Sequence, residues 1–533
     1  MNLFTSIFTA ERLERPAILF EHRTISYAEL RAETLRVAAL LSAHGIAPGD
    51  RVAMLLADSP EFIAAFVAVI FLGGVAVPVN LALRREEQLF ILNDCGARVA
   101  IVEASIAPAL FENAKAPAGL TSLIVVSRVA EQLPEIAGVR VQDFAAADED
   151  VATSAALSYG RAADTDRDAF ILYTSGSTGE PKGAVHTEAH IFYTNETYCR
   201  EVLKLEVADR LFSSSRLPFA YGLGNAFTFP LLNGCTAILC REKPAPEVIA
   251  QVFENYRPTI FFGVPVVYRM LLERFGTGAR HGSSLPGSSH AGGTLNTSSL
   301  RLCISAGEAL PAHLGQAWED TFGVQVLDGI GSTEMLHMFM SNHDGELRYG
   351  SSGRLLAGYD ARLLDHEGRD VPSAAAGNLW IRGGSAASRY WQRTEVSAQT
   401  FVDDWVRTGD LYRCDGEGFW WHMGRSDDCF KASGQWVSPI EVEGVLLRSD
   451  SVRSAAVVEG RDASGLSCVC AFLVPAGDCD PHLAETNARA LCETALPRFK
   501  QPRRYIFVAE LPYTATGKLQ RFKLREQLRS DLP

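Results

Sequence analysis

The feature that most constrains the fold is an uncharged apolar run, FIAAFVAVIFLGGVAVPV, which occupies residues 62–79. Its length approaches that of a membrane span. Gly73 and Gly74 interrupt the run and Pro78 lies near its end, so we predict a buried helix over residues 60–72 and a buried strand over residues 75–79. A strand that is apolar on both faces is typical of a parallel sheet covered by helices. The run therefore indicates an α/β core rather than a membrane anchor.

Short β-branched runs alternate with helical periodicity over most of the chain before residue 400. Strands are predicted over residues 51–56, 99–102, 123–126, 169–173 and 259–263, and further helices over residues 26–44, 84–94 and 246–256. This βαβ rhythm predicts largely parallel sheets. Between residues 360 and 380 the pattern changes to short alternating strands with a turn at residues 365–368, which predicts a small antiparallel unit.

The chain after Gly424 has the character of a separate small α+β domain. Strands are predicted over residues 452–458, 467–473 and 504–508, and helices over residues 439–447 and 482–496. Cys468 and Cys470 are predicted to share one face of their strand, with Val469 on the other. The expected fold class is α/β, with a large N-terminal domain of βαβ-type sheets, a small β unit, and a small α+β C-terminal domain.

Charge and cysteine content argue against several functions. A net charge of −13 is not that of a general nucleic-acid binder. The 11 cysteines show no metal-ligand spacing, which argues against structural zinc and favours reduced thiols in the cytoplasm. The first residues lack the pattern of a signal peptide. Residues 276–299 are rich in Gly, Ser, His and Thr and are expected to form a mobile surface loop without a chemical role.

The strongest local motif is ILYTSGSTGEPKGAV at residues 171–185, where a β-run leads into a loop of Ser, Thr and Gly. Glycines allow consecutive backbone N–H groups to converge on a phosphate, and hydroxyls and a lysine add donors and charge. The spacing is not that of a Walker A motif. The candidate phosphate-binding residues are Thr174, Ser175, Gly176, Ser177, Thr178 and Lys182.

This string resembles the phosphate-binding signature of the adenylate-forming superfamily, which contains acyl- and aryl-CoA synthetases, nonribosomal adenylation domains and firefly luciferase. Four further fragments resemble motifs of that superfamily in the same order: DGIGSTE at residues 328–334, TGD at 408–410, GRSD at 424–427 and YTATGKLQR at 513–521. A glutamate, an aspartate or a lysine alone would be read as a capping, turn or surface residue. Five fragments in the right order make the resemblance cover essentially the whole chain.

The resemblance implies a role for each matching residue. Thr333 would contact the α-phosphate of ATP, Glu334 would hold Mg²⁺, and Lys518 would be the catalytic lysine of adenylate formation. Asp410 and Arg425 would grip the ribose. Further nucleotide contacts would come from Gly307, Glu308, Asp328 and Gly329. The domains implied are residues 1–426, which bind ATP and the acid, and residues 427–533, a mobile lid with its hinge at Asp427.

The segment LPFAYGLGNAFTFP at residues 217–230 corresponds to the acid pocket and contains no acidic residue. An unpaired buried ammonium is costly, so an α-amino acid is not expected as substrate. This segment, residues 328–342 and residues 424–443 all resemble benzoate-CoA ligases. The resemblance implies a flat aryl pocket, with His337 as a hydrogen-bond donor to the carboxylate or to a ring substituent, lined by Phe219, Ala220, Tyr221, Ile330, Gly331 and His337.

The loop KASGQW at residues 431–436 resembles the segment that borders the pantetheine channel, and it would place Lys431 and Gly434 beside coenzyme A. The sequence thus predicts an ATP- and Mg²⁺-dependent ligase that activates benzoate or a substituted benzoate, such as 2-aminobenzoate, and transfers it to coenzyme A. Two alternatives are an enzyme that loads an aryl acid onto a carrier protein and a non-catalytic nucleotide sensor. The second is disfavoured because Lys518, Glu334 and Asp410 are all present. The sequence leaves open whether the protein is a monomer or a homodimer.

Overall fold

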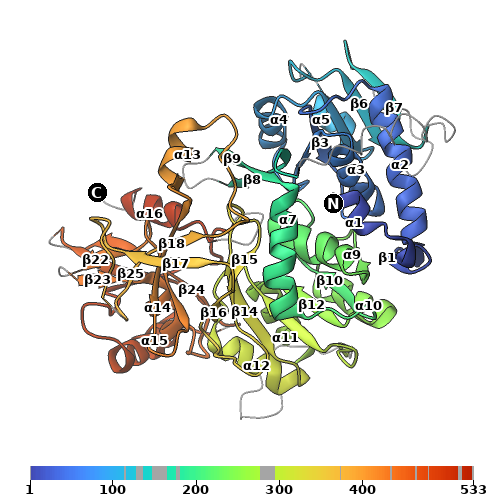
Figure 1. The fold of residues 1–533 in the computed structure, drawn as a ribbon. Coiled ribbons are helices and arrows are strands. Elements are labelled where there is room, and N and C mark those ends of the chain that lie inside the picture. The colour runs from blue at the N-terminus through green and yellow to red at the C-terminus, as the bar shows by residue number, and fades with distance from the viewer. Residues whose placement is uncertain are drawn as a thin grey trace.

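The computed structural model describes residues 2–112, 116–127, 136–146, 165–175, 180–276, 294–372, 374–432, 435–462, 465–477, 479–513 and 519–530. Two sheets form the framework of its N-terminal part (Figure 1). The sheet nearer the N-terminus has the strand order β7 (Arg140–Asp143), β6 (Ser122–Val126), β5 (Val99–Glu103), β3 (Arg51–Leu55), β4 (Val75–Pro78), β8 (Asp168–Ser175) and β9 (Pro181–Thr187). Its neighbours pair in parallel except β8 and β9, which form an antiparallel hairpin.

The second sheet has parallel inner strands and antiparallel edges. Its order is β16 (Arg354–Leu355), β15 (Met338–Ser341), β14 (Val326–Gly331), β13 (Leu302–Ser305), β12 (Ile260–Gly263), β10 (Arg210–Ser213), β11 (Thr236–Ile238), β1 (Pro16–Phe20) and β2 (Arg23–Ser26). The largely parallel sheets predicted from the βαβ rhythm are therefore confirmed.

Helix α3 (Pro60–Phe71) lies between the two sheets, and every one of its described side chains except Glu61 is buried. Ser59 caps it by accepting a hydrogen bond from the Phe62 backbone at 3.3 Å. Phe66 contacts Phe170 of β8 on one side and Phe227 on the other, with ring centroids 5.5 and 5.4 Å apart. The predicted buried helix followed by a buried strand is confirmed. No helix among the described residues combines the length and apolar character needed to cross a membrane.

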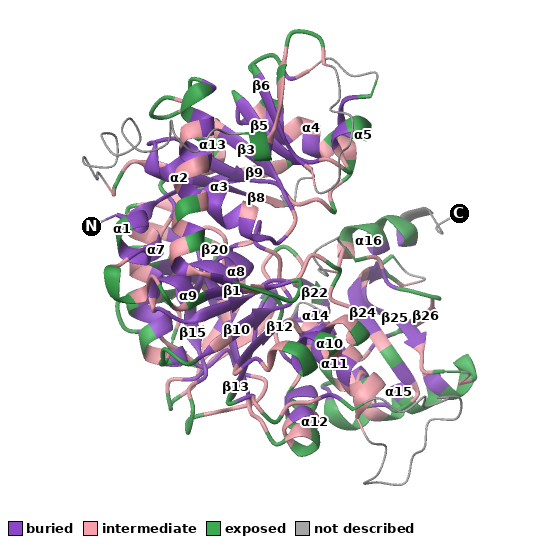
Figure 2. Cartoon of the chain, turned by 90° about the vertical axis from the view of Figure 1, so that its right-hand side faces the viewer, coloured by how far each residue is buried: buried purple, intermediate pink, exposed green. Residues whose placement is uncertain are grey.

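The remaining helices of the N-terminal part cover the sheets, and Figure 2 shows buried residues gathered in the sheets and in the layer between them. Two helices contain π-helical turns, η4 and η5, which the sequence pattern did not predict. The elements are α1 (Leu3–Ile7), η1 (Ala10–Arg12), α2 (Tyr27–Ala43), α4 (Arg85–Asp94), α5 (Ala107–Phe111), η2 (Phe144–Ala146), α7 (Glu188–Thr194), η4 (Asn195–Leu203), α8 (Ala220–Leu223), η5 (Gly224–Thr228), α9 (Phe229–Leu232), α10 (Pro246–Tyr256), α11 (Pro265–Phe275) and α12 (Ala312–Phe322).

A small antiparallel sheet follows, as the alternation after residue 360 predicts. It contains β17 (Asp360–Leu364), β18 (Gly377–Arg382), β19 (Phe401–Val402), β20 (Trp405–Cys414) and β21 (Trp420–Arg425), with α13 (Thr394–Thr400) beside it. The pairing of β20 with β21 sets Asp410 opposite Arg425.

The C-terminal part is an α+β unit, shown in orange and red in Figure 1. A sheet of β24 (Val452–Arg461), β25 (Ser467–Pro475) and β26 (Arg504–Phe507) packs with α14 (Pro439–Leu446), α15 (Pro481–Ala495) and α16 (Arg521–Ser530), beside the hairpin β22 (Phe430–Ala432) and β23 (Gln435–Val437). Cys468 and Cys470 lie in one core cluster, with their sulfurs 3.9 Å apart, and Val469 lies in the other, as predicted.

Candidate active site

The predicted phosphate loop joins β8 to β9. Thr174 pairs with Lys182 across this hairpin, and Ser175 pairs with Pro181. The two described ends of the loop therefore lie side by side. Gly176, Ser177 and Thr178 lie outside the described residues. The Nζ atom of Lys182 lies over the ring of Tyr390, 5.9 Å from its centroid.

The same tyrosine connects the phosphate hairpin to the predicted metal ligand. The Tyr390 hydroxyl donates to Oε1 of Glu334 at 2.6 Å, and the backbone N–H of Ala387 donates to the carbonyl of Glu334 at 2.7 Å. Burial, followed by the negative charge of Glu334, raises the pKa of Tyr390, so this hydroxyl remains a donor. Lys182 and Glu334 are thus brought together around a residue that the sequence analysis missed.

The turn that carries Thr333 and Glu334 is fixed mainly through its backbone. Nε2 of His186 lies 2.8 Å from the carbonyl oxygen of Thr333, and Nδ1 of His186 lies 3.0 Å from Nδ1 of His190. Burial, together with the neighbouring His190, lowers the pKa of His186 to about 3, so the ring is neutral and donates to the carbonyl. Leu336 has a φ of 61°, the left-handed region, which reverses the chain into β15.

Asp328 ends the parallel part of β14 and is buried. Its Oδ2 accepts from the Leu310 backbone at 3.2 Å, and its carbonyl accepts from the Asn342 amide nitrogen at 3.0 Å. Burial raises the pKa of Asp328 to about 8. Gly307, with a φ of 93°, lies in the same connection as Leu310, so this predicted pair of nucleotide-binding segments is adjacent.

The predicted ribose-binding residues also meet. Nη1 of Arg425 lies 3.3 Å from Oδ1 of Asp410 and donates to the carbonyl of Thr408 at 2.8 Å. His422 Nε2 lies 3.5 Å from the same carboxylate oxygen. The carboxylate is therefore held at the end of the β20–β21 pairing, where its position depends on that hairpin.

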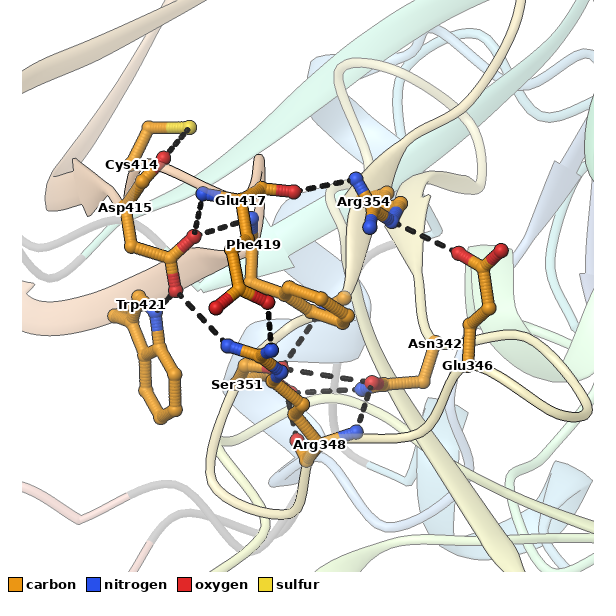
Figure 3. Close-up of polar contacts among 11 residues, drawn as sticks. Asn342, Glu346, Arg348, Ser351, Arg354, Cys414, Asp415, Glu417, Phe419 and Trp421 are labelled. Carbon is orange, nitrogen blue, oxygen red and sulfur yellow. Dashed lines mark hydrogen bonds and ion pairs between the residues drawn. The ribbon is translucent and has the colours of Figure 1, made fainter.

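A cluster of charged and aromatic side chains braces the far end of this hairpin (Figure 3). The guanidinium groups of Arg348 and Arg354 lie over the ring of Phe419, 4.3 and 4.5 Å from its centroid. Arg348 also pairs with Glu417, and Asp415 accepts from the Trp421 indole at 2.8 Å. Cation–π contacts and ion pairs thus tie the hairpin to the loop that follows β15.

The predicted aryl-pocket residues come from two segments that face each other. Tyr221 of α8 lies beside His337, with ring centroids 5.8 Å apart, and its hydroxyl points to the carbonyl of Ile304 at 3.3 Å. Ile330 packs against the same apolar cluster, Gly331 touches the His337 backbone, Ala220 is buried, and Phe219 is the N-cap of α8. Burial lowers the pKa of His337 to about 3, so a neutral imidazole lies in an apolar site.

The predicted hinge lies between the two parts of the chain. Asp427 follows Arg425 in a turn, and the next residue, Asp428, binds Arg525 at 2.9 Å. Lys431 is exposed on β22. Gly434 and Lys518 lie outside the described residues, as do residues 277–293 of the predicted surface loop.

The two parts also touch away from the hinge. Arg269 of α11 donates to the Ser454 hydroxyl at 3.2 Å. Tyr513, one of the two described residues that flank 514–518, has its pKa raised by burial, and it lies within range of the opposing charges of Arg269 and Glu308.

A magnesium ion fits the donors present. Glu334 offers one carboxylate, which accepts from the Tyr390 hydroxyl, and Mg²⁺ on a nucleotide is usually held by one or two carboxylates together with the phosphates. Within the described part of the chain, no group of three or more His, Cys, Asp or Glu side chains is arranged to hold a metal by itself. An ion here would therefore depend on the nucleotide for its other ligands.

Three candidate site residues were missed from the sequence. His186 lies near the end of β9 and His190 lies on α7, so their four-residue spacing does not mark one helix face, and no local signal in the sequence indicates their contact. Tyr390 carries no such signal, because its partner Glu334 is 56 residues away.

Comparison with known proteins supports the same family over most of the chain. Residues 8–391 match the AMP-binding enzyme family, and residues 441–518 match the C-terminal domain of AMP-binding enzymes. A benzoate–CoA ligase of Thauera aromatica is 39% identical over 504 residues, 94% of this chain and 90% of that protein.

Solved structures agree with the sequence match. An anthranilate CoA ligase in complex with anthranoyl-AMP superimposes with a TM-score of 0.86 at 32% identity, covering 99% of this chain and 98% of that one. A benzoate CoA ligase from Burkholderia xenovorans LB400 gives 0.84 at 36% identity, covering 98% and 100%. The chain therefore belongs to the AMP-binding enzyme family, within the adenylate-forming superfamily, and benzoate-CoA ligases are among its relatives.

Proposed function

We propose that the chain is an ATP-dependent aryl-CoA ligase that forms an aryl-AMP intermediate and releases AMP. The observation that carries the proposal is the short turn from Thr333 to His337. One end of this turn holds Glu334 beside Tyr390 and Lys182, and the other end places His337 among buried aromatic rings. In this proposal, the residues that serve the phosphates and their metal ion, Thr333 and Glu334, and the residue that serves the ring, His337, come from one turn.

The first reaction joins the acid to AMP. A carboxylate oxygen attacks the α-phosphorus of ATP, and the bond to pyrophosphate breaks. Two anions must approach, so cationic and donor groups around the phosphate lower the barrier. Lys182, Thr174, Ser175 and Thr333 supply such groups in this proposal, and Lys518 supplies the cation nearest the reacting atoms. Mg²⁺, held by Glu334, would neutralise charge on the phosphates.

The second reaction transfers the acyl group. The thiol of coenzyme A loses its proton, its sulfur attacks the carbonyl carbon, and the bond to AMP breaks to give a thioester. We propose that residues 427–533 rotate about Asp427 between the two reactions, which exchanges Lys518 for the loop with Lys431 and Gly434. The gap between the two family matches, residues 392–440, contains this proposed boundary.

The substrate in this proposal is benzoate or a substituted benzoate. The segment 217–230 contains no acidic residue that would pair with an α-ammonium, and the benzoate and anthranilate ligases among the relatives act on aromatic acids. We also propose a cytoplasmic location, supported by scattered cysteines without a disulfide framework.

Mass spectrometry of the reaction products tests the proposal. The purified protein is incubated with ATP, Mg²⁺ and a panel of benzoates, each with and without coenzyme A. We expect aryl-CoA and AMP only when coenzyme A is present. Aryl-AMP that accumulates and is never transferred to coenzyme A would instead indicate an enzyme that loads a carrier protein. No adenylate with any benzoate would contradict the assignment of the acid pocket.

A further inference from the structure

Several polar side chains in the aryl region are buried without partners. The Tyr198 hydroxyl has no hydrogen-bond partner among the described residues, although Tyr198 is 0% exposed. His337 is 3% exposed, and neither of its ring nitrogens has a partner of ordinary hydrogen-bond geometry within the described chain. Buried polar groups in native proteins are normally paired, so unpaired ones in a binding region indicate a ligand or an ordered water.

Tyr198 and His337 lie against each other in a compact aromatic group. Their ring centroids are 4.8 Å apart, and Phe229 closes the group from the side at 4.7 Å from His337. Gly224 makes room for the imidazole, because a Cβ atom there would lie 2.6 Å from Cδ2 of His337. Apolar rings therefore surround two polar groups, the Tyr198 hydroxyl and the His337 imidazole.

Two of the segments that build this group are π-helical. Tyr198 lies on η4, and Gly224 lies on η5, next to the fully buried Asn225, whose two amide atoms also have no partner among the described residues. Single π-helical turns disrupt regular helical pairing and are frequent at functional sites. The departure from α-helix at both places is consistent with a site shaped for a ligand rather than with ordinary core packing.

The chemistry of the group defines the ligand. A neutral imidazole has one donor and one acceptor, and a tyrosine hydroxyl can donate and accept. Together they suit an amino or hydroxyl group. They offer no charge to a second carboxylate, and an unsubstituted ring leaves them unpaired.

We propose that Tyr198 and His337 form a subsite for a hydrogen-bonding ring substituent, which makes the enzyme selective for an aminobenzoate or a hydroxybenzoate over benzoate itself. This inference rests on the proposed aryl-CoA ligase function and names its substrate class. Tyr198 is a specificity-determining residue in this proposal and takes no part in the chemical steps.

The test compares Tyr198→Phe with Tyr359→Phe. Both tyrosines are buried in the same core cluster, but the Tyr359 hydroxyl is paired with the Ser385 hydroxyl at 2.9 Å. The kcat/KM of wild type and both variants is measured with benzoate, 2-aminobenzoate, 3-hydroxybenzoate and 4-hydroxybenzoate. We expect wild type to prefer one polar-substituted acid, and Tyr198→Phe to lose about tenfold or more of that preference while benzoate is little affected. Tyr359→Phe should leave the preference unchanged.

A second measurement needs no variant and covers the case in which Tyr198→Phe does not fold. Wild-type affinity for the preferred acid is compared by calorimetry with that for the methylbenzoate of the same substitution pattern. We expect the methyl compound to bind about tenfold more weakly, because it cannot pair with the two polar groups.

Three results would overturn the inference. They are equal affinity for the methyl compound, a wild-type preference for benzoate, and a uniform loss with all four acids in Tyr198→Phe. Failure to activate any of the acids would overturn the proposed function itself, and the inference with it.

Discussion

The phosphate side and the aryl side of the site differ in how their polar groups are satisfied. On the phosphate side, the Thr333 carbonyl, the Glu334 carboxylate and the Asp410 carboxylate each lie within hydrogen-bond distance of a named partner. On the aryl side, the Tyr198 hydroxyl and the His337 ring nitrogens are more deeply buried and make no hydrogen bond of ordinary geometry with a described residue, the Tyr221 backbone being a polar neighbour of the imidazole. Partnered groups are already oriented for charge stabilisation, whereas unpartnered buried groups gain most when a ligand arrives.

This difference implies that changes on the two sides will have different signatures. A change on the phosphate side should slow adenylation of every acid alike, because all acids share the same phosphates. A change on the aryl side should alter which acid is used, because the unpaired atoms face the variable part of the substrate. The predictions below test this separation: those for the phosphate side run from the largest expected effect to the smallest, and one for the aryl side follows.

The largest effect is expected from Lys518→Ala. If Lys518 supplies the cation beside the reacting phosphate and carboxylate, as proposed, its loss should reduce adenylate formation about a hundredfold or more. Thioester formation from preformed aryl-AMP should suffer less, because that step does not build charge at phosphorus. The two half-reactions are measured separately, with several benzoates. Equal loss in both half-reactions would contradict the role of Lys518, and a loss that depends on the acid would contradict the separation of the two sides.

The Asp427→Pro variant tests whether adenylation proceeds without rotation of the C-terminal unit. Proline fixes φ and restricts the turn that joins β21 to Asp428. If Asp427 is the pivot, adenylation should be preserved, while thioester formation slows on the order of tenfold to a hundredfold because the second loop is misplaced. Single-turnover assays of each step give the answer. Two unchanged steps would mean that this residue is not the pivot.

Tyr390→Phe removes only the hydroxyl that orients Glu334. Groups that hold a metal ligand in place typically contribute tenfold or more to metal affinity, so the Mg²⁺ concentration for half-maximal adenylation should rise about tenfold. Mn²⁺ binding in the presence of ATP, followed by electron paramagnetic resonance, provides a readout that does not depend on turnover. Tyr359→Phe is the matched control. An unchanged Mn²⁺ affinity would show that the 2.6 Å contact does not position the carboxylate.

The parts of this molecule that were predictable from sequence are those whose signal is local. The apolar run at residues 62–79 predicts α3 and β4, because elements buried on all sides are apolar throughout, unlike elements at the surface. Lys182 and Glu334 could be named from contiguous motifs. Their mutual proximity and the role of Tyr390 could not, since the contacts join segments far apart in the chain. The π-helical turns at Tyr198 and Gly224 could not be predicted from the sequence either, because the apolar residues there follow the same pattern as in an α-helix.

The last prediction concerns stability rather than turnover and tests the charge state of the aryl side. The pKa of His337 is lowered by burial to about 3, below the usual 6.5, so the folded protein binds the proton more weakly than the unfolded chain does. Its contribution to stability is therefore complete above pH 6.5 and is lost as the pH falls below it, by about 2 kcal/mol at pH 5. Between pH 6.5 and 4.5, the free energy of unfolding should fall less steeply with decreasing pH in His337→Gln than in wild type. The two slopes should differ by about 1.4 kcal/mol per pH unit. Urea unfolding over this range measures the slope, with His366→Gln, at an exposed position, as control. An unchanged slope would mean that the imidazole is already paired when the site is empty, and the contrast between the two sides would then fail.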